Sequence, residues 1–291
     1  MYNAKELSTT SGIPYVLATN VPRIDIFKTF DCGQCFRFDP VSLFGNKYEY
    51  GGVAFGKYVV FAQNCDTEII VYGATIDEFE KIWARFLSLD VDYEKIDNHI
   101  ISTLGSNHMT KATEYSYGIR ILRQDMWESL CSFIISQNNN IPRIKKIISA
   151  LCKKYGDVVE FNGEKHYSFP SAKVLKDAGI DAIFELKTGF RARYIHDASC
   201  KVADGEIILD KIKEIDFELA LTELCKIKGV GLKVASCALL FGFEKTEAFP
   251  IDVWMKRAID THFGGCFDHK ALGKSAGIAQ QYLFYYEKYN T

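Results

Sequence analysis

The sequence predicts an α+β protein in which an N-terminal antiparallel sheet is followed by a helical domain. Runs of β-branched and aromatic residues lie before Tyr72, and apolar residues recur at helical spacing from Asp77 onward. We expect two domains, a sheet domain with trailing helices at 1–115 and a helical domain at 116–291. A chain of 291 residues, 48% of them hydrophobic, is long enough to bury a substantial core.

Two early segments have the composition of β-strands. Tyr58–Ala62 and Glu68–Tyr72 are dominated by β-branched and aromatic side chains. Turn residues accompany them at Gly45-Asn46, Gly51-Gly52 and Asn64. These segments therefore predict an antiparallel sheet with turns at those three places.

The remaining chain has the period of helices. Apolar residues three to four apart define the first helical stretch, namely Phe79, Ile82, Trp83, Phe86 and Leu87. Helical texture continues to the C-terminus and is interrupted by expected turns near Gly118, Gly156 to Gly163, Gly205 and Gly264-Gly265. Short helices should therefore dominate this part.

Charge and hydropathy exclude some classes of function. The net charge of −2 divides into −4 before Thr113 and +2 from there on, so no global basic surface is expected. This argues against non-specific polyanion binding but leaves room for a local DNA-binding patch. The chain has no apolar run of membrane length, and its first ten residues do not resemble a signal peptide.

The cysteine pattern indicates a reducing compartment and no metal cluster. Nine cysteines are scattered along the chain, and Cys32 and Cys35 form a C-x-x-C spacing with no second pair. We expect neither a zinc site nor a full set of disulfides.

A glycine hairpin followed by a lysine is the most informative segment. Lys228-Gly229-Val230-Gly231 lies between two helical stretches, so the free amides of the second helix could hold a phosphate. Lys233 falls in the first turn of that helix. Asp252 follows 19 residues later, after Pro250, at a helix N-cap position. The alternatives are that the hairpin is an ordinary turn, that Lys233 is a solvated surface residue, and that Asp252 is only a helix cap.

A second polar segment follows a helix that Asp125 is expected to cap. The apolar face of that helix contains Trp127, Leu130, Phe133 and Ile134, and the helix should end in the run 137–140. Three consecutive asparagines either terminate the helix in the left-handed conformation or present a carboxamide to a ligand.

Four motifs in order resemble one enzyme family. They are GQCFRF from Gly33, SQNNNIPRI from Ser136, GFRARY from Gly189, and the hairpin with its later aspartate. The chain is similar to the 8-oxoguanine DNA glycosylases of the eukaryotic type, in the helix-hairpin-helix Gly/Pro-Asp superfamily, and we expect a bacterial member. The resemblance implies a bifunctional glycosylase and AP lyase, with Lys233 as the nucleophile and Asp252 as its essential partner.

The resemblance also implies roles for residues that contact DNA. Gly33, Gln280, Phe284 and Cys237 would recognise the damaged base. Asn138, Arg143, Phe190 and Arg191 would fill the vacated space and contact the orphan cytosine. Gly229, Gly231 and Trp254 would contact phosphates. Three positions depart from the family pattern: Phe190 replaces a tyrosine, Trp254 a phosphate-contacting histidine, and Phe241 a methionine of the base pocket.

No cofactor is expected. The four-cysteine iron–sulfur loop of related glycosylases is missing, because only Cys266 follows Trp254. Superfamily members can hold a monovalent cation on hairpin carbonyls, which would be those of Cys225, Ile227 and Val230. The expected partner is duplex DNA containing 8-oxoguanine, bound by a monomer in the cytoplasm, at the nucleoid when on DNA.

Two other functions remain open at this point. A non-catalytic helix-hairpin-helix module would use the hairpin only to hold phosphate, which the joint presence of Lys233 and Asp252 disfavours. A monofunctional glycosylase for alkylated bases would share the layout but lack the lysine.

Overall fold

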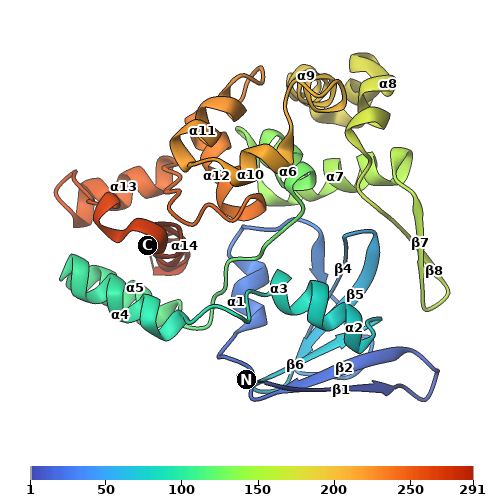
Figure 1. The fold of residues 1–291 in the computed structure, drawn as a ribbon, viewed down its shortest axis with the longest axis horizontal. Coiled ribbons are helices and arrows are strands. Elements are labelled where there is room, and N and C mark those ends of the chain that lie inside the picture. The colour runs from blue at the N-terminus through green and yellow to red at the C-terminus, as the bar shows by residue number, and fades with distance from the viewer. Residues whose placement is uncertain (1, 291) are drawn as a thin grey trace.

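The computed structural model describes residues 2–290 and contains the predicted sheet and helical parts (Figure 1). The sheet is antiparallel with strand order β1-β2-β6-β5-β4-β3. Its strands are β1 Asn3–Ser8, β2 Pro14–Thr19, β3 Phe38–Pro40, β4 Tyr48–Ala54, β5 Lys57–Gln63 and β6 Glu68–Tyr72. Both predicted strands are confirmed, as β5 and β6.

The prediction of a turn at Gly51-Gly52 is wrong, because both glycines lie inside β4. They are needed for close packing within the sheet. A Cβ on Gly51 would lie 2.3 Å from the Tyr58 hydroxyl oxygen, and one on Gly52 would lie 2.4 Å from the Arg37 carbonyl oxygen. Glycine inside a strand often marks such a close approach.

An aromatic core joins the sheet to short helices that cover one of its faces. These elements are α1 Ile26–Asp31, α2 Ile76–Glu78, the π-helical turn η1 Phe79–Trp83 and α3 Ala84–Phe86. Phe61 is central, with ring centroids 5.6 Å from Phe86 and 5.7 Å from Trp83. The helical spacing recognised from Phe79 onward therefore buries its apolar side against the sheet.

Eleven α-helices build the remainder of residues 2–290, and their shared core extends from Cys32 to Tyr285. They are α4 Tyr93–Leu104, α5 Asn107–Tyr115, α6 Met126–Ser136, α7 Ile141–Tyr155, α8 Ala172–Ile183, α9 Arg191–Ala203, α10 Leu209–Glu214, α11 Phe217–Cys225, α12 Leu232–Gly242, α13 Val253–His262 and α14 Ala276–Asn290. Two irregular turns, η2 Phe184–Thr188 and η3 Lys270–Ser275, precede α9 and α14. Helices α4 and α5 contribute Ile100 and Met109 to this helical core, although they precede residue 116.

The turn expected between Gly156 and Gly163 is part of a β-hairpin, and the two strands of this hairpin were not predicted. Strands β7 Val158–Phe161 and β8 Glu164–Tyr167 form an antiparallel hairpin that extends from the helical part towards the sheet (Figure 1). His166 stacks on Tyr58 with ring centroids 3.7 Å apart, and Phe161 packs against the same ring at 4.8 Å. Contact with the sheet stabilises a hairpin that would be marginal alone.

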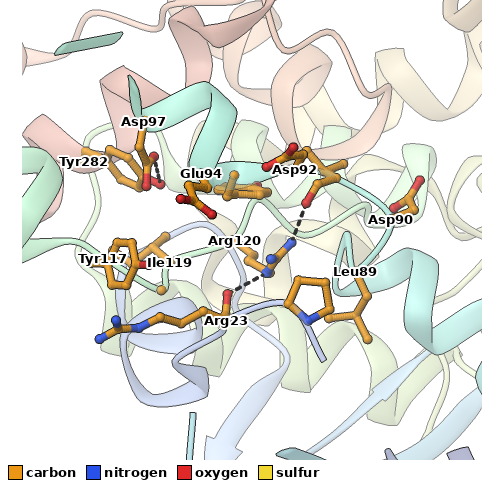
Figure 2. A pocket seen from close by; sticks show the side chains of 14 residues that line it. Arg23, Leu89, Asp90, Asp92, Glu94, Asp97, Tyr117, Ile119, Arg120 and Tyr282 are labelled. Atoms are coloured by element: carbon orange, nitrogen blue, oxygen red, sulfur yellow. Dashed lines mark hydrogen bonds between the residues drawn. The ribbon is translucent and has the colours of Figure 1, made fainter. Parts of the chain in front are cut away.

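A polar pocket of about 320 Å³ lies where the α3–α4 connection meets α14 (Figure 2). In it Tyr282 donates a hydrogen bond of 2.9 Å to Asp97, and burial raises the pKa of that carboxyl to about 6. Arg120 donates to the carbonyl oxygens of Arg23 and Ser88 at 3.1 and 2.6 Å. None of the predicted site residues lines this pocket, and its contacts hold α14 against α4.

Within residues 2–290, no helix combines the length and the apolar character needed to cross a membrane.

Candidate active site

The predicted hairpin connects α11 to α12 and is shaped by one glycine. Gly229 has φ +77°, and Val230 donates its N–H to the Ile227 carbonyl at 3.0 Å. Helix α12 begins after Gly231 with no side-chain cap, so its first amides are available to an anion. Gly231 has φ −98°, which any residue can adopt, so only Gly229 requires glycine for its backbone conformation.

Gly229→Ala is expected to destabilise the protein by roughly 2–4 kcal/mol, through left-handed strain plus overpacking. The added Cβ would lie 2.3 Å from the Tyr194 ring. Gly231→Ala is the matched control, because a Cβ there would meet nothing within 4 Å. Urea unfolding measures both variants. Equal stabilities of the two variants would contradict this account of the hairpin.

One small pocket brings together the residues expected at the reacting centre. Lys233, Cys237 and Phe241 line it from α12, and Asp252 lines it from the start of α13. Gly33, Gln280 and Phe284 line it from the α1–β3 loop and from α14. Its volume is about 60 Å³.

Lys233 is half-buried at the second position of α12, one helical turn before Cys237. Burial raises the pKa of the Cys237 thiol to about 11, against the opposing effects of the Lys233 charge and its hydrogen bond. The thiol is therefore neutral near pH 7. A neutral thiol is a poor nucleophile, which leaves the Lys233 amine as the candidate nucleophile on this face of α12.

Asp252 caps α13, as its sequence position predicts. Its side chain accepts the N–H of Met255 at 2.8 Å, and its extended backbone precedes the first helical turn. The carboxylate also lines the pocket that Lys233 lines. Asp252 therefore both caps α13 and lines the same pocket as Lys233.

Gly33 has a backbone conformation that favours glycine. It has φ +79°, and a Cβ there would lie 3.5 Å from the Phe284 ring and 4.0 Å from the side chain of Ile141. Gln280 is buried, and its carboxamide oxygen has no hydrogen-bond partner among residues 2–290. A buried acceptor in this state at a pocket wall is a candidate for ligand contact.

The residues expected at the orphan base gather around the start of α7 and of α9. Asn138 is exposed with φ +46°, and Asn140 rather than Asn138 caps α7. Phe190 is 49% exposed and lies over the Arg191 guanidinium at 4.4 Å. Arg143 is exposed and donates to the Lys187 carbonyl at 3.3 Å.

Arg191 is 2% exposed, so a solvated surface charge is the wrong description of this residue. Its guanidinium donates to the main-chain carbonyls of Gln137, Asn138 and Thr188. Burial and the nearby Arg143 charge lower the pKa of Arg191. These bonds tie the asparagine loop to the N-terminus of α9.

Trp254 and the possible cation ligands lie apart from the pocket lining. Trp254 is 50% exposed in the first turn of α13, with the Arg257 guanidinium 5.4 Å from its ring centroid. Of the three hairpin carbonyls considered for a cation, that of Ile227 already accepts the Val230 N–H.

Two buried glutamines that position Gly33 were missed by sequence reasoning. Gln34 donates to the Thr29 and Arg120 carbonyls and accepts the Leu122 N–H at 2.8 Å. Gln281 donates to the Cys32 carbonyl at 2.7 Å. The sequence does show both glutamines as polar residues among apolar ones. Their hydrogen-bond partners could not be identified from sequence, because they lie up to 249 residues away.

Two family models together match residues 16–269. The 8-oxoguanine DNA glycosylase N-terminal domain covers 16–130, and the HhH-GPD superfamily base excision DNA repair protein covers 131–269. The junction of the two matches falls within α6.

Curated relatives and solved structures agree with these models. A probable N-glycosylase/DNA lyase of Methanothermobacter thermautotrophicus is 31% identical over 62% of this chain and 67% of its own length. The N-glycosylase/DNA lyase of Saccharomyces cerevisiae is 28% identical over 83% and 69%, respectively. The structure of Clostridium acetobutylicum 8-oxoguanine glycosylase/lyase, in complex with duplex DNA containing cytosine opposite 8-oxoguanine, is 34% identical. It has a TM-score of 0.88 and covers 100% of this chain and 98% of its own.

Proposed function

Because this chain belongs to the 8-oxoguanine DNA glycosylases, which are bifunctional N-glycosylase/DNA lyases of base excision repair, we propose that it excises the lesion by attack of Lys233. Its substrate is duplex DNA containing 8-oxoguanine. The observation that carries the mechanism is the meeting of Lys233, Asp252, Gly33 and Gln280 in one pocket.

The lysine amine is the nucleophile. Its neutral form attacks C1′ of the flipped nucleotide, the N-glycosidic bond breaks, and the base leaves with the bonding electrons and takes up a proton. Opening of the sugar ring gives a Schiff base to Lys233. Loss of a C2′ proton then eliminates the 3′ phosphate and nicks the strand.

Asp252 supplies charge rather than a covalent bond. Positive charge develops on the sugar as the base departs, and a fixed carboxylate beside C1′ stabilises it. The Met255 N–H that Asp252 accepts holds the carboxylate in one orientation. The cap therefore orients the catalytic group.

The lesion differs from guanine by a hydrogen on N7, and recognition of the lesion would depend on that hydrogen. Guanine presents N7 as an acceptor, whereas the keto form of 8-oxoguanine carries a hydrogen there. The Gly33 carbonyl would satisfy the lesion and repel guanine, which is discrimination through a buried unpaired group. Gln280 would contact another edge of the base, between walls made by Phe284 and Cys237.

The orphan cytosine is contacted from the opposite side. Asn138 would enter the space that the base vacates, and Phe190 would stack between neighbouring bases. Arg143 is exposed and can donate to cytosine O2 and N3. The four hydrogen bonds of Arg191 within residues 2–290 leave one of its five N–H groups for the base.

Phosphate binding is assigned to the hairpin and α13. The backbone amides after Gly229 and Gly231 would form a phosphate-binding site. The Trp254 indole would donate one N–H to a phosphate without adding positive charge. Carbonyls of Cys225, Ile227 and Val230 could hold a monovalent cation beneath it. We expect a monomer that acts in the cytoplasm.

Borohydride trapping on an 8-oxoguanine:C duplex tests the proposal, with an undamaged G:C duplex as the control. We expect a covalent adduct with the lesion duplex only. Base release with no adduct would instead indicate a monofunctional glycosylase, and binding with no base release would indicate a non-catalytic module.

Phe190→Tyr is expected to sharpen the preference for cytosine opposite the lesion by up to about tenfold. The ring area is unchanged, and the added hydroxyl supplies a hydrogen bond worth roughly 0.5–1.5 kcal/mol net. Single-turnover excision opposite C, T, G and A measures the ratios. Unchanged ratios would assign the preference to Arg143 and Arg191 instead of the wedge hydroxyl.

A further inference from the structure

An open pocket of about 590 Å³ lies beside Phe190, separate from the pocket that Lys233 lines. The end of α8, the turn η2 and the start of α9 form its walls, and α8 and α9 pack side by side (Figure 1). Three exposed apolar side chains line it, those of Ile180, Phe184 and Phe190, and Phe184 is 58% exposed. Exposed apolar patches rimmed by polar residues mark interaction sites, so this pocket is a candidate for an occupant outside the chain.

The turn that carries Phe184 is strained and is tied to the residues proposed to contact the orphan cytosine. Lys187 has φ +62°, a left-handed conformation that few residues other than glycine adopt. Arg143 donates to the Lys187 carbonyl at 3.3 Å, and Arg191 donates to the Thr188 carbonyl at 3.2 Å. Strain of this kind persists only where surrounding contacts enforce it, so these bonds fix Phe184 relative to both arginines.

The side chains around the pocket fit a nucleobase. Tyr194 packs edge to face against Phe190 with ring centroids 5.7 Å apart, so two rings form one wall. Arg193 is exposed and would attract a phosphate backbone, whereas the exposed Asp181 carboxylate can accept N–H groups from a base edge. Exposed rings combined with a cation are the groups with which proteins bind bases outside a duplex stack.

A wedge creates the kind of base that this pocket would take. In the proposed function, Phe190 enters between two neighbouring bases at the orphan cytosine, and such an insertion unstacks that step at a cost in free energy. The neighbour of the cytosine then has one bare face. A second ring beside the wedge can stack on that face and offset the loss. Phe184 is placed to do so, because it lines the same pocket as Phe190.

We infer that this pocket binds the nucleotide next to the orphan cytosine on the undamaged strand, with its base stacked on Phe184. The inference rests on the proposed function, because it requires Phe190 to be the wedge. It makes lesion binding depend on a base that the excision chemistry never touches.

A double-mutant cycle between protein and DNA tests this inference. One change is Phe184→Ala, and the other replaces the 5′ or the 3′ neighbour of the orphan cytosine with a tetrahydrofuran abasic nucleotide. Affinities for 8-oxoguanine:C duplexes are measured in the Lys233→Gln background, which cannot form a Schiff base. We expect Phe184→Ala to weaken binding about tenfold when both neighbours carry bases. The loss should fall below about twofold when the base on one of the two sides is absent.

Phe27→Ala is the matched control, since Phe27 is also an exposed ring but lies on α1 and does not line the pocket. It should bind every duplex as well as Lys233→Gln alone. Because Phe184 is more than half exposed, Phe184→Ala should fold, and its circular dichroism and thermal midpoint establish this independently.

Two results would overturn the inference. An equal loss of affinity on all three duplexes would show that Phe184 contacts neither neighbouring base. No loss on any duplex would show that DNA does not occupy the pocket. Borohydride trapping with the wild-type chain reports on the proposed function separately, so a trapped adduct without coupling in the cycle would refute this inference alone.

Discussion

Lys233→Gln is expected to eliminate both borohydride trapping and strand nicking while leaving affinity for lesion DNA largely intact. In the proposed mechanism the amine nitrogen of Lys233 bonds C1′, and a glutamine carboxamide cannot form a Schiff base. The hairpin amides and the pocket walls, which are proposed to bind the DNA, remain. Trapping and gel analysis measure the chemistry, and titration of a labelled 8-oxoguanine duplex measures binding.

Lys228→Gln is the matched control for this substitution. Lys228 is exposed on the same hairpin, and its main-chain N–H, which the substitution retains, donates to Asp197 at 2.7 Å. That variant should still give the trapped adduct at saturating enzyme. A trapped adduct that persists in Lys233→Gln would identify another amine as the nucleophile.

Asp252→Asn is expected to slow single-turnover base excision by about 10²- to 10³-fold, the range seen when a preorganised electrostatic group is removed. The carboxylate charge is lost, whereas the capping acceptor for the Met255 N–H is retained. Asparagine caps helices about as well as aspartate, so the thermal midpoint should change little. A quenched-flow or manual time course with enzyme in excess gives the rate.

The cap of a neighbouring helix provides the control for charge removal. Asp216 caps α11 by accepting the Leu219 N–H at 3.0 Å and does not line the pocket. Asp216→Asn should leave excision unchanged. If Asp252→Asn also excised at the wild-type rate, Asp252 would be a structural cap alone.

Local chemistry explains which predictions from sequence succeeded. Strands β5 and β6, the cap at Asp125 and the cap at Asp252 depend on residues close together in the chain. The α+β class follows from the change of apolar period near Asp77, and the six-stranded sheet and the helices confirm it.

Long-range packing explains the errors. Gly51 and Gly52 look like turn residues, but side chains and backbone from elsewhere in the sheet domain demand glycine inside β4. The β7–β8 hairpin has a turn signal at Asn162-Gly163, yet its pairing is stabilised by Tyr58, a residue about a hundred positions earlier. Neither effect is visible in a short window of sequence.

By itself, the sequence determined the fold class and the candidate catalytic groups, which are a lysine after a glycine hairpin and an aspartate at the start of a helix. Only the tertiary structure decided that the pocket beside Lys233 is about 60 Å³, that Arg191 is buried against main-chain carbonyls, and that Phe184 and Phe190 line one pocket. The physical reason is that pattern and capping act over a few residues, whereas burial and pocket volume depend on contacts between helices distant in sequence.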